Sequence, residues 1–249
     1  VAGAADNILT TLEAFGFEWD GPVLWQTMRA EAYAEALERL KLAGLAYGCA
    51  CSRKEIADSA GLAAIDGGVV YPGTCRAGMT GNRAARAWRL QVGLESTVFE
   101  DRLQGRIAQV LERDVGDFVL RRADGLFAYQ LAVTVDDHFQ GISDVVRGAD
   151  LMASTPRQLW LQRCLGFATP SYAHLPVVGN AAGEKLSKQT LAPALDAGRA
   201  AELLVNALGF LGQPVPSGLS RATVGEVWSW AHENWSFALI PRRPLIPLA

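Results

Sequence analysis

Gly183-Glu184-Lys185-Leu186-Ser187-Lys188-Gln189 is the stretch of the sequence that says most about its fold. Two lysines stand three residues apart, with a serine between them, in a glycine-led loop after the short apolar run 175–178. Mobile ammonium groups suit a polyphosphate, because each is a point charge that can follow phosphates as charge develops on them. A solvated basic loop has the same pattern, and for an isolated Lys-x-Ser-Lys that interpretation is favoured. The loop has to be judged with the rest of the chain.

The composition indicates a soluble globular protein. The chain has 249 residues, half of them apolar and a fifth charged, which is enough for one large domain or two small ones. The formal net charge is -3, so any contact with RNA has to come from a local basic patch. No apolar run approaches the roughly 20 residues of a spanning helix, and no charged-then-apolar leader opens the chain. We therefore expect a cytoplasmic protein with no membrane contact.

Apolar spacing predicts helices around residues 8–15 and 33–40, each followed by a glycine. Alternation over 87–92 predicts a half-buried strand with Arg89 and Gln91 on its outer face. Short apolar runs with β-branched residues predict strands at 118–120, 131–135, 145–146 and 175–178.

A further helix is expected to start at Ser154 or Thr155, with Pro156 in its first turn, and to end at Gly166. After Pro193 the pattern is helical. Strands separated by helices suggest a parallel-sheet α/β domain. Its boundary with a smaller helical part is expected near residues 190–200.

Three of the four cysteines lie in residues 47–82, a glycine-rich segment with little periodicity that we interpret as an insertion. One residue separates Cys49 from Cys51, and Cys75 follows Tyr71-Pro-Gly-Thr. Zinc prefers four ligands in a tetrahedron and binds thiolates well, whereas tyrosine is an uncommon ligand with a pKa near 10. Spacing alone leaves both a zinc site and three thiols without metal open. Cys164 shares a helix stripe with Trp160 and is expected in the core.

Several ordered motifs together resemble the glutamyl branch of the class I aminoacyl-tRNA synthetases, and most closely the glutamyl-queuosine tRNA(Asp) synthetases. Lys185-Leu186-Ser187-Lys188-Gln189 is similar to the KMSKS loop of that class. The resemblance runs from about the first residue to Arg243. The other motifs that carry it are Val115-Gly116-Asp117-Phe118-Val119-Leu120-Arg121-Arg122, Phe127-Ala128-Tyr129-Gln130-Leu131-Ala132, Val135-Asp136-Asp137, Asp144-Val145-Val146-Arg147-Gly148-Ala149-Asp150-Leu151, Ser154-Thr155-Pro156-Arg157-Gln158 and Ile240-Pro241-Arg242-Arg243.

The resemblance implies roles for individual residues. Tyr129 and Arg147 match the family's glutamate-binding pair, and a guanidinium can hold a carboxylate through two parallel hydrogen bonds. Arg147 taken alone has a structural alternative, an ion pair with Asp144 or Asp150. The remaining implied sites are catalytic Lys185 and Lys188, an ATP-binding loop formed by Lys185, Ser187 and Lys188, and zinc ligands Cys49, Cys51, Tyr71 and Cys75. The histidines His138, His174 and His232 match none of the family's retained site motifs and are expected to be structural.

Two departures from the family matter. The HIGH motif and the early glutamate-binding residues are absent, and the resemblance would place them before Val1. We therefore expect an N-terminally truncated chain, and the sequence leaves open whether it is active without that segment. Only 60 residues follow the lysine loop, from 190 to 249, whereas a tRNA-charging glutamyl enzyme carries a large anticodon-binding region there.

The sequence thus predicts a class I synthetase catalytic domain, a Rossmann-like α/β fold over residues 1–195 with a zinc-binding insertion at about 47–82, and a helical C-terminal part over 196–249. The implied reaction is ATP- and magnesium-dependent activation of glutamate and its transfer to queuosine in tRNA(Asp), by a monomer. One alternative is a truncated glutamyl-tRNA synthetase, and Ile240-Pro241-Arg242-Arg243 near the end of the chain argues against it. The other is a non-catalytic RNA-binding module that kept the fold. An upstream segment with a HIGH-like motif would argue against the second.

Overall fold

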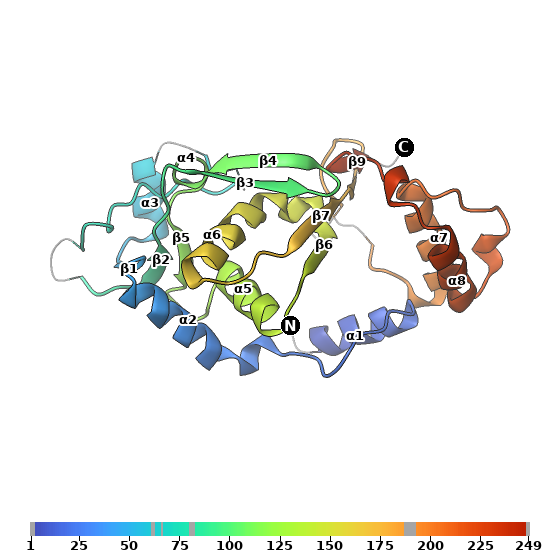
Figure 1. Cartoon of the computed structure of the whole chain (residues 1–249), viewed down its shortest axis with the longest axis horizontal. Helices are drawn as coiled ribbons and strands as arrows, with labels where there is room; N and C mark the ends of the chain where they lie inside the picture. The colour runs from blue at the N-terminus through green and yellow to red at the C-terminus, as the bar shows by residue number, and fades with distance from the viewer. Residues whose placement is uncertain (1–2, 61–62, 66, 80–82, 187–192, 248–249) are drawn as a thin grey trace. The chain divides into compact units, whose positions relative to one another are not determined.

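The computed structural model describes residues 3–60, 63–65, 67–79, 83–186 and 193–247. It divides into two compact units, which are described separately below (Figure 1). One unit is Leu24–His174, and the other combines Val1–Val23 with Leu175–Ala249. The predicted domain boundary at residue 195 stays a prediction.

The Leu24–His174 unit contains helices and short strands in alternation. Its helices are α2 (Ala30–Leu42), α3 (Arg53–Ala60), α4 (Leu111–Asp114), α5 (Tyr129–Phe139) and α6 (Thr155–Leu165), with 3-10 turns at Gln26–Met28 and Ala149–Ser154. Its strands are β1 (Ala46–Cys49), β2 (Ala87–Leu90), β3 (Ser96–Asp101), β4 (Gly105–Val110), β5 (Phe118–Arg121), β6 (Asp144–Gly148) and β7 (Ser171–Leu175).

The strands form two sheets, in the orders β1-β2-β5 and β4-β3-β7-β6. The first sheet is antiparallel throughout. In the second, β3 runs antiparallel to β4 and parallel to β7. The prediction of a parallel-sheet domain is therefore correct only in part, because the sheets are mixed. Alternation of helices and strands along the chain does not by itself fix strand direction when short connections such as that between β3 and β4 make hairpins.

One hydrophobic core joins α2, α5 and α6 to the β1-β2-β5 sheet. Its fully buried members include Leu40 of α2, Leu120 of β5, Leu131 of α5 and Leu161 of α6. The strand predicted at 131–135 is wrong, since these residues lie within helix α5. The pattern of a short apolar run does not by itself distinguish a buried helical segment from a buried strand.

Strand β2 also departs from its predicted pattern. Leu90 and Val92 are buried as expected, but Arg89 is only 9% exposed, so the predicted outer face is covered too. Helix α6 runs from Thr155 to Leu165 and is closed by Gly166, where the backbone is left-handed with φ 69°, as predicted. Ser154 makes no capping hydrogen bond, and its hydroxyl instead accepts one from Gln130.

The second unit is mainly helical in its C-terminal half, as predicted. It contains α1 (Ala4–Ala14), α7 (Ala200–Phe210), α8 (Val224–Asn234), β8 (Val177–Gly179), β9 (Leu245–Pro247) and 3-10 turns at Ala197–Arg199, Leu219–Arg221 and Phe237–Leu239. Strands β8 and β9 pair in parallel. Helix α8 begins with a capping box, in which Thr223 and Glu226 satisfy each other's free N–H groups. Leu208 of α7 packs against Val227 and Ala231 of α8.

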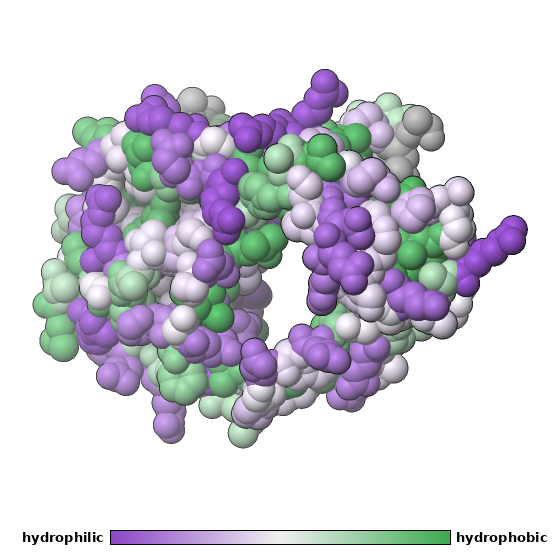
Figure 2. Space-filling model, turned by 45° about the vertical axis from the view of Figure 1, so that its right-hand side comes forward, coloured by the Kyte–Doolittle hydropathy of each residue, from purple (hydrophilic) through white to green (hydrophobic). Residues whose placement is uncertain are grey.

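Among the described residues, none of the helices has the length and apolar character needed to cross a membrane. On the face drawn in Figure 2, hydrophilic and hydrophobic residues are interspersed.

Candidate functional site

Arg147 of β6 is held by neutral hydrogen-bond partners. Its Nε donates to Nε2 of His174 at 3.1 Å, and its Nη2 donates to Oγ1 of Thr155 at 2.8 Å and to Oε1 of Gln158 at 2.9 Å. Of the five N–H groups of a guanidinium, this leaves the two on Nη1 with no acceptor among the described residues. Arg147 therefore keeps its full charge and presents one free edge.

His174 is fully buried beside Asp101. The Nδ1 of His174 lies 2.6 Å from Oδ2 of Asp101, while Oδ1 of Asp101 accepts the backbone N–H groups of Leu103, Gln104 and His174. Burial acts to raise the pKa of Asp101, but these hydrogen bonds outweigh it and hold the pKa below its usual range. Burial lowers the pKa of His174 despite the opposing influence of Asp101. The pair is therefore a carboxylate and a neutral imidazole.

The structural alternative for Arg147, an ion pair with Asp144 or Asp150, is not what the structure shows. The hydrogen-bond partners of Arg147 are neutral. Asp144 instead accepts a short hydrogen bond from Ser171 and lies 3.5 Å from Nη1 of Arg102. Arg147 is thus oriented without being neutralised.

Tyr129 is the first residue of α5, and its side chain is 46% exposed. The ring of Tyr172 lies 5.6 Å from the guanidinium carbon of Arg147. Burial raises the pKa of Tyr172, and the charges of Arg147, Asp137 and Tyr129 also influence it. Arg147 therefore lies beside Tyr172, and among the described residues no hydrogen bond or ring contact joins Tyr129 to either of them. Their joint role in binding stays a prediction.

Asp136, within the Val-Asp-Asp motif, has a structural role that the sequence did not reveal. Its carboxylate accepts hydrogen bonds from Tyr33 at 2.6 Å, Arg29 at 2.7 Å and Gln26 at 3.3 Å. These contacts join the region of α2 to α5, which carries Tyr129.

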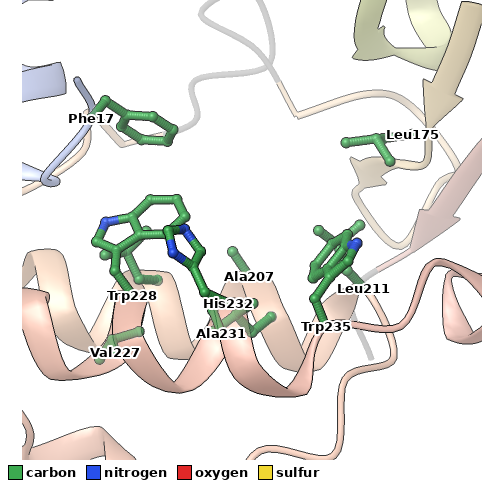
Figure 3. Close-up of a pocket in the computed structure, with 11 residues that line it drawn as sticks. Phe17, Leu175, Ala207, Leu211, Val227, Trp228, Ala231, His232 and Trp235 are labelled. Atoms are coloured by element: carbon green, nitrogen blue, oxygen red, sulfur yellow. The ribbon is translucent and has the colours of Figure 1, made fainter. Parts of the chain in front are cut away.

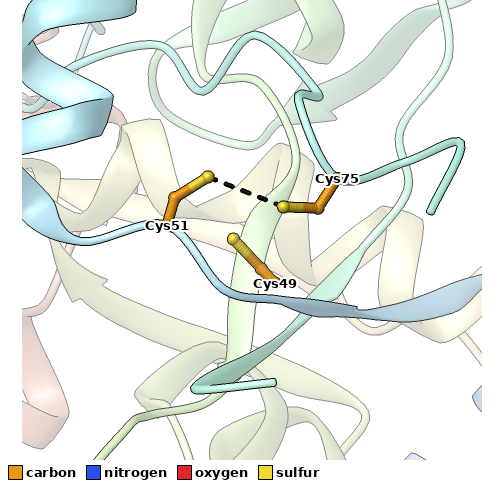
Figure 4. Close-up of side chains that lie close together, drawn as sticks. All are labelled: Cys49, Cys51 and Cys75. Carbon is orange, nitrogen blue, oxygen red and sulfur yellow. Dashed lines mark hydrogen bonds between the residues drawn. The ribbon is translucent and has the colours of Figure 1, made fainter. Parts of the chain in front are cut away.

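The three cysteines predicted as metal ligands lie together. The sulfurs of Cys49, Cys51 and Cys75 are all within 4.8 Å of one another and point toward a common centre (Figure 4). Cys51 and Cys75 are 3.6 Å apart, and the hydroxyl of Tyr71 lies 3.3 Å from Cys49 and 3.8 Å from Cys51. Two segments separated by more than 20 residues thus form one cluster.

This donor set fits a tetrahedral zinc ion. A Zn–S distance of about 2.3 Å places neighbouring sulfurs about 3.8 Å apart, close to the separation of Cys51 and Cys75. Burial raises the pKa of Cys51 to about 11 and that of Tyr71 above its ordinary range. A bound cation would have to supply the charge that ionises the phenol. Tyr71 is therefore the weakest metal donor of the four, and the three thiols form the core of the site.

A basic depression of about 620 Å³ lies beside the cysteine cluster, with Cys51 in its wall. Within the described part of the chain, Arg53, Lys54 and Arg86 form no ion pair, whereas Arg122 pairs with Asp124 at 2.6 Å. Arg53 and Lys54 lie in the first turn of α3, where the helix dipole already favours anions. The depression is therefore a local concentration of positive charge in a chain of negative net charge; its charged lining residues are Arg53, Lys54, Arg86, Arg89, Arg122 and Asp124.

The lysine loop follows β8 in the other unit. The side chain of Asn180 accepts the backbone N–H groups of Ala182 and Glu184, and Gly183 adopts φ 78°, so a tight turn precedes Lys185. Lys185 is exposed. Ser187 and Lys188 lie outside the described residues, so their predicted role in ATP binding is untested.

The same unit contains an apolar cavity of about 360 Å³ between α7 and α8 (Figure 3). Phe17 and Leu175 lie opposite Trp228, His232 and Trp235 across it. Nearly all of its lining is apolar, which suits neither a carboxylate nor a phosphate.

Comparison with known proteins defines the class. The family model for the class I tRNA synthetases of the E and Q type, catalytic domain, matches residues 1–227. The fold is similar to that of a glutamate-tRNA synthetase from Elizabethkingia anophelis, with a TM-score of 0.74, 19% identity, and coverage of 100% of this chain and 58% of that one. A glutamate tRNA ligase from Elizabethkingia meningosepticum gives a TM-score of 0.71 at 19% identity, covering 98% and 57% of the two chains. The catalytic fold of class I synthetases, with mixed sheets and helices, is therefore present.

Closer relatives define the branch. The chain is 70% identical over 248 residues to the glutamyl-Q tRNA(Asp) synthetase of Dechloromonas aromatica, covering 100% of this chain and 82% of the relative. It is 56% identical over 250 residues to the protein of that name from Chromobacterium violaceum, covering 100% and 83%. The chain belongs to the glutamyl-Q tRNA(Asp) synthetase family. The resemblance inferred from the sequence motifs is thus confirmed.

Sequence reasoning missed the residues that support Arg147. Thr155 and Gln158 stand in a motif that carried the family resemblance, so a signal existed for them. Asp101 and His174 had none, because they are 73 residues apart and belong to no quoted motif.

Proposed function

We propose that this protein activates glutamate with ATP, giving glutamyl-adenylate and pyrophosphate, and transfers the glutamyl group to the queuosine base of tRNA(Asp). The observation that carries the proposal is the free Nη1 edge of Arg147, a full cation oriented entirely by neutral groups. Such a group favours a carboxylate ligand, because a guanidinium and a carboxylate can form two parallel charge-assisted hydrogen bonds. The names of the relatives supply the reaction.

The proposed pocket distinguishes glutamate from glutamine by charge. The two amino acids differ only at the end of the side chain. Glutamate has two acceptor oxygens there, whereas glutamine has one oxygen and an NH₂ group that would face the N–H groups of Arg147. Leaving part of a cationic group unsatisfied is costly, and sites built on such pairs reject the mismatched ligand strongly. Tyr129 adds a hydroxyl that can donate to or accept from the substrate.

ATP is assigned to Lys185, Ser187 and Lys188, with Lys185 and Lys188 as the catalytic cations. Adenylate formation needs no side-chain nucleophile, so its catalysis rests on positioning and on stabilising charge as pyrophosphate leaves. Magnesium would accompany ATP as part of the substrate.

We assign one structural zinc ion to Cys49, Cys51, Cys75 and Tyr71. The ion would supply the positive charge that keeps the clustered donors deprotonated and would tie β1 to the segment that carries Cys75.

Contact with tRNA is assigned to the basic depression. Phosphate groups supply most of the affinity of proteins for nucleic acids, and they are bound by lysines and arginines. The free charges of Arg53, Lys54 and Arg86 are suited to this, and they provide the local patch that the net charge of the chain requires. A monomer in the cytoplasm remains the expected state of the protein.

The decisive experiment measures two activities. Pyrophosphate exchange should depend on glutamate, and labelled glutamate should appear on tRNA(Asp) that carries queuosine but not on tRNA(Asp) without it. The assay uses the 249-residue chain and a version that also carries the upstream segment expected from the family. Charging of tRNA(Glu) by either protein would favour the tRNA-charging alternative, and RNA binding without exchange in both would favour the non-catalytic one.

A further inference from the structure

We propose that Asp101 and His174 are positioning residues that aim Arg147 at the substrate carboxylate by fixing the tautomer of His174. The inference rests on the proposed function, in which Arg147 holds glutamate. It adds two residues that do not touch the substrate, are remote in sequence from Arg147, and act through hydrogen bonds in the protein interior.

The tautomer follows from the neighbours that can act in only one direction, since the hydroxyl of Thr155, 3.2 Å from Nε2 of His174, can either donate or accept. Asp101 is a carboxylate and can only accept a hydrogen bond, so Nδ1 of His174 carries the proton. Arg147 can only donate, so Nε2 of His174 presents its lone pair. The opposite tautomer would set an N–H against an N–H at one end of the ring and a lone pair against a carboxylate at the other.

The imidazole is also held in its plane. The Asp101 and His174 side chains are both 0% exposed. The ring of Tyr172 lies nearly parallel to that of His174, at 6.1 Å between centroids and 7° between planes, and Phe99 flanks it at 6.4 Å. A flip of the ring would break the 2.6 Å bond to Asp101 inside this packing.

A fixed acceptor at Nε2 matters because arginine has many rotamers. Fixing such a side chain in one rotamer costs conformational entropy. Hydrogen bonds to His174, Thr155 and Gln158 fix the Arg147 side chain before the substrate binds, so that its Nη1 is already oriented. Loss of the Nε2 acceptor should therefore weaken glutamate binding and leave ATP binding unchanged.

Asp101→Asn should change the tautomer of His174, while the side chain at position 101 keeps almost the same size and shape. Three backbone N–H groups donate to Oδ1 of Asp101, so the oxygen of an asparagine would stay at that position. Its NH₂ group would then face Nδ1 of His174 and force the proton onto Nε2, against Arg147. The variant should present two opposed donors where the wild type has a hydrogen bond.

The test measures the tautomer and the substrate affinity in the same samples, using the chain with its expected upstream segment. Ring nitrogen shifts in ¹⁵N-histidine-labelled protein should show His174 protonated at Nδ1 in the wild type and at Nε2 in Asp101→Asn. Titration with L-glutamate should show about tenfold or greater weakening in Asp101→Asn, with the ATP affinity within about twofold of wild type. The control His138→Asn changes an exposed histidine stacked on Phe167 and should alter neither affinity.

The outcomes separate this inference from the proposed function. If Arg147→Ala leaves glutamate binding intact, the proposed function fails. If Arg147→Ala abolishes binding but Asp101→Asn binds normally, or if the wild-type proton is on Nε2, the positioning role is wrong. Should Asp101→Asn not fold, His174→Gln and His174→Phe replace it. The glutamine amide oxygen can still accept from Arg147 and should keep affinity within about threefold, whereas phenylalanine has no acceptor and should lose about tenfold; normal binding by the phenylalanine variant would overturn the inference.

Discussion

Arg76 and Asp117, 41 residues apart, form a two-pronged ion pair that joins the cysteine-bearing segment to the start of β5. The Nη2 and Nε atoms of Arg76 donate to the two carboxylate oxygens of Asp117 at 2.6 and 2.9 Å. Asp117 is 0% exposed and also accepts hydrogen bonds from the hydroxyl of Tyr47 and the backbone of Val92. Because Arg76 follows Cys75 directly, this pair holds one side of the proposed metal site in place.

Asp117→Ala should therefore destabilise the protein. Removing the carboxylate leaves Nε of Arg76, the hydroxyl of Tyr47 and the backbone N–H of Val92 unsatisfied, although Arg76 keeps its ion pair with Glu112. We expect a loss of about 2–4 kcal/mol in the free energy of unfolding, less than for a fully buried pair because Arg76 is partly exposed. Urea unfolding with the metal content held constant measures it. Arg113→Ala breaks an exposed pair with Asp114 and should change stability little. Equal effects of the two variants would contradict the anchoring role.

Cys75→Ser should remove most of the bound metal. Purified wild-type protein is expected to contain close to one equivalent of zinc by elemental analysis, because the three clustered thiols are strong zinc donors. Cys164→Ser is the control, since that thiol is partly buried against the core around α6 and away from the cluster. A wild-type protein that is folded, reduced and free of zinc would refute the assignment.

Arg147→Ala should reduce glutamate activation by at least about a hundredfold and remove the preference for glutamate over glutamine. The reason is that the guanidinium supplies the only charge complement that we assign to the side-chain carboxylate. Calorimetry with both amino acids measures the affinities, on the 249-residue chain and on the chain with its expected upstream segment. The shorter chain should bind glutamate weakly. Tight binding that the substitution leaves unchanged would locate the pocket elsewhere.

The triple variant Arg53→Ala, Lys54→Ala, Arg86→Ala should weaken RNA binding and flatten its salt dependence. Each lost phosphate contact reduces the slope of log K against log salt by about 0.7–0.9. Fluorescence anisotropy with a tRNA(Asp) anticodon stem-loop provides the measurement. The control, Arg106→Ala with Arg163→Ala, removes two exposed arginines outside the basic depression. An unchanged slope in the triple variant would show that RNA binds another surface.

Stability should fall as the pH is lowered below about 6.5, owing to His174. Its folded pKa is below the ordinary value near 6.5, so between the two values the unfolded chain binds more protons and the free energy of unfolding decreases with falling pH. Asp101 and Asp150 favour protonation of the ring and Arg147 opposes it, but burial dominates. The pKa of Asp101 is itself lowered, so its contribution is lost only at much more acid pH.

The measurement is denaturant unfolding between about pH 7.5 and pH 5. His174→Gln cannot be protonated in this range, and its stability should depend less on pH than that of the wild type. His138→Gln, which replaces an exposed histidine, should retain the wild-type slope. A slope that is the same in the wild type and in His174→Gln would show that another group titrates.

The sequence by itself determined the family and most of the helices. Helix boundaries depend on local chemistry, and Pro156 with Gly166 located α6 correctly. Several motifs in one order identified the family, and that resemblance pointed to a cluster of Cys49, Cys51 and Cys75. None of these inferences required knowledge of which distant segments meet.

Tertiary structure decided the rest, because burial and partners depend on segments far apart in the chain. Residues 131–135 have a pattern that fits a strand or a buried helix, and packing against α2 and α6 made them helical. Arg89 alternates like a surface residue, yet its guanidinium carbon lies 3.9 Å from the ring centre of Tyr71. Asp101 and His174 carry no motif, and only the pairing of β3 with β7 brings them next to each other, so that a buried carboxylate can set the proton on the imidazole that orients Arg147.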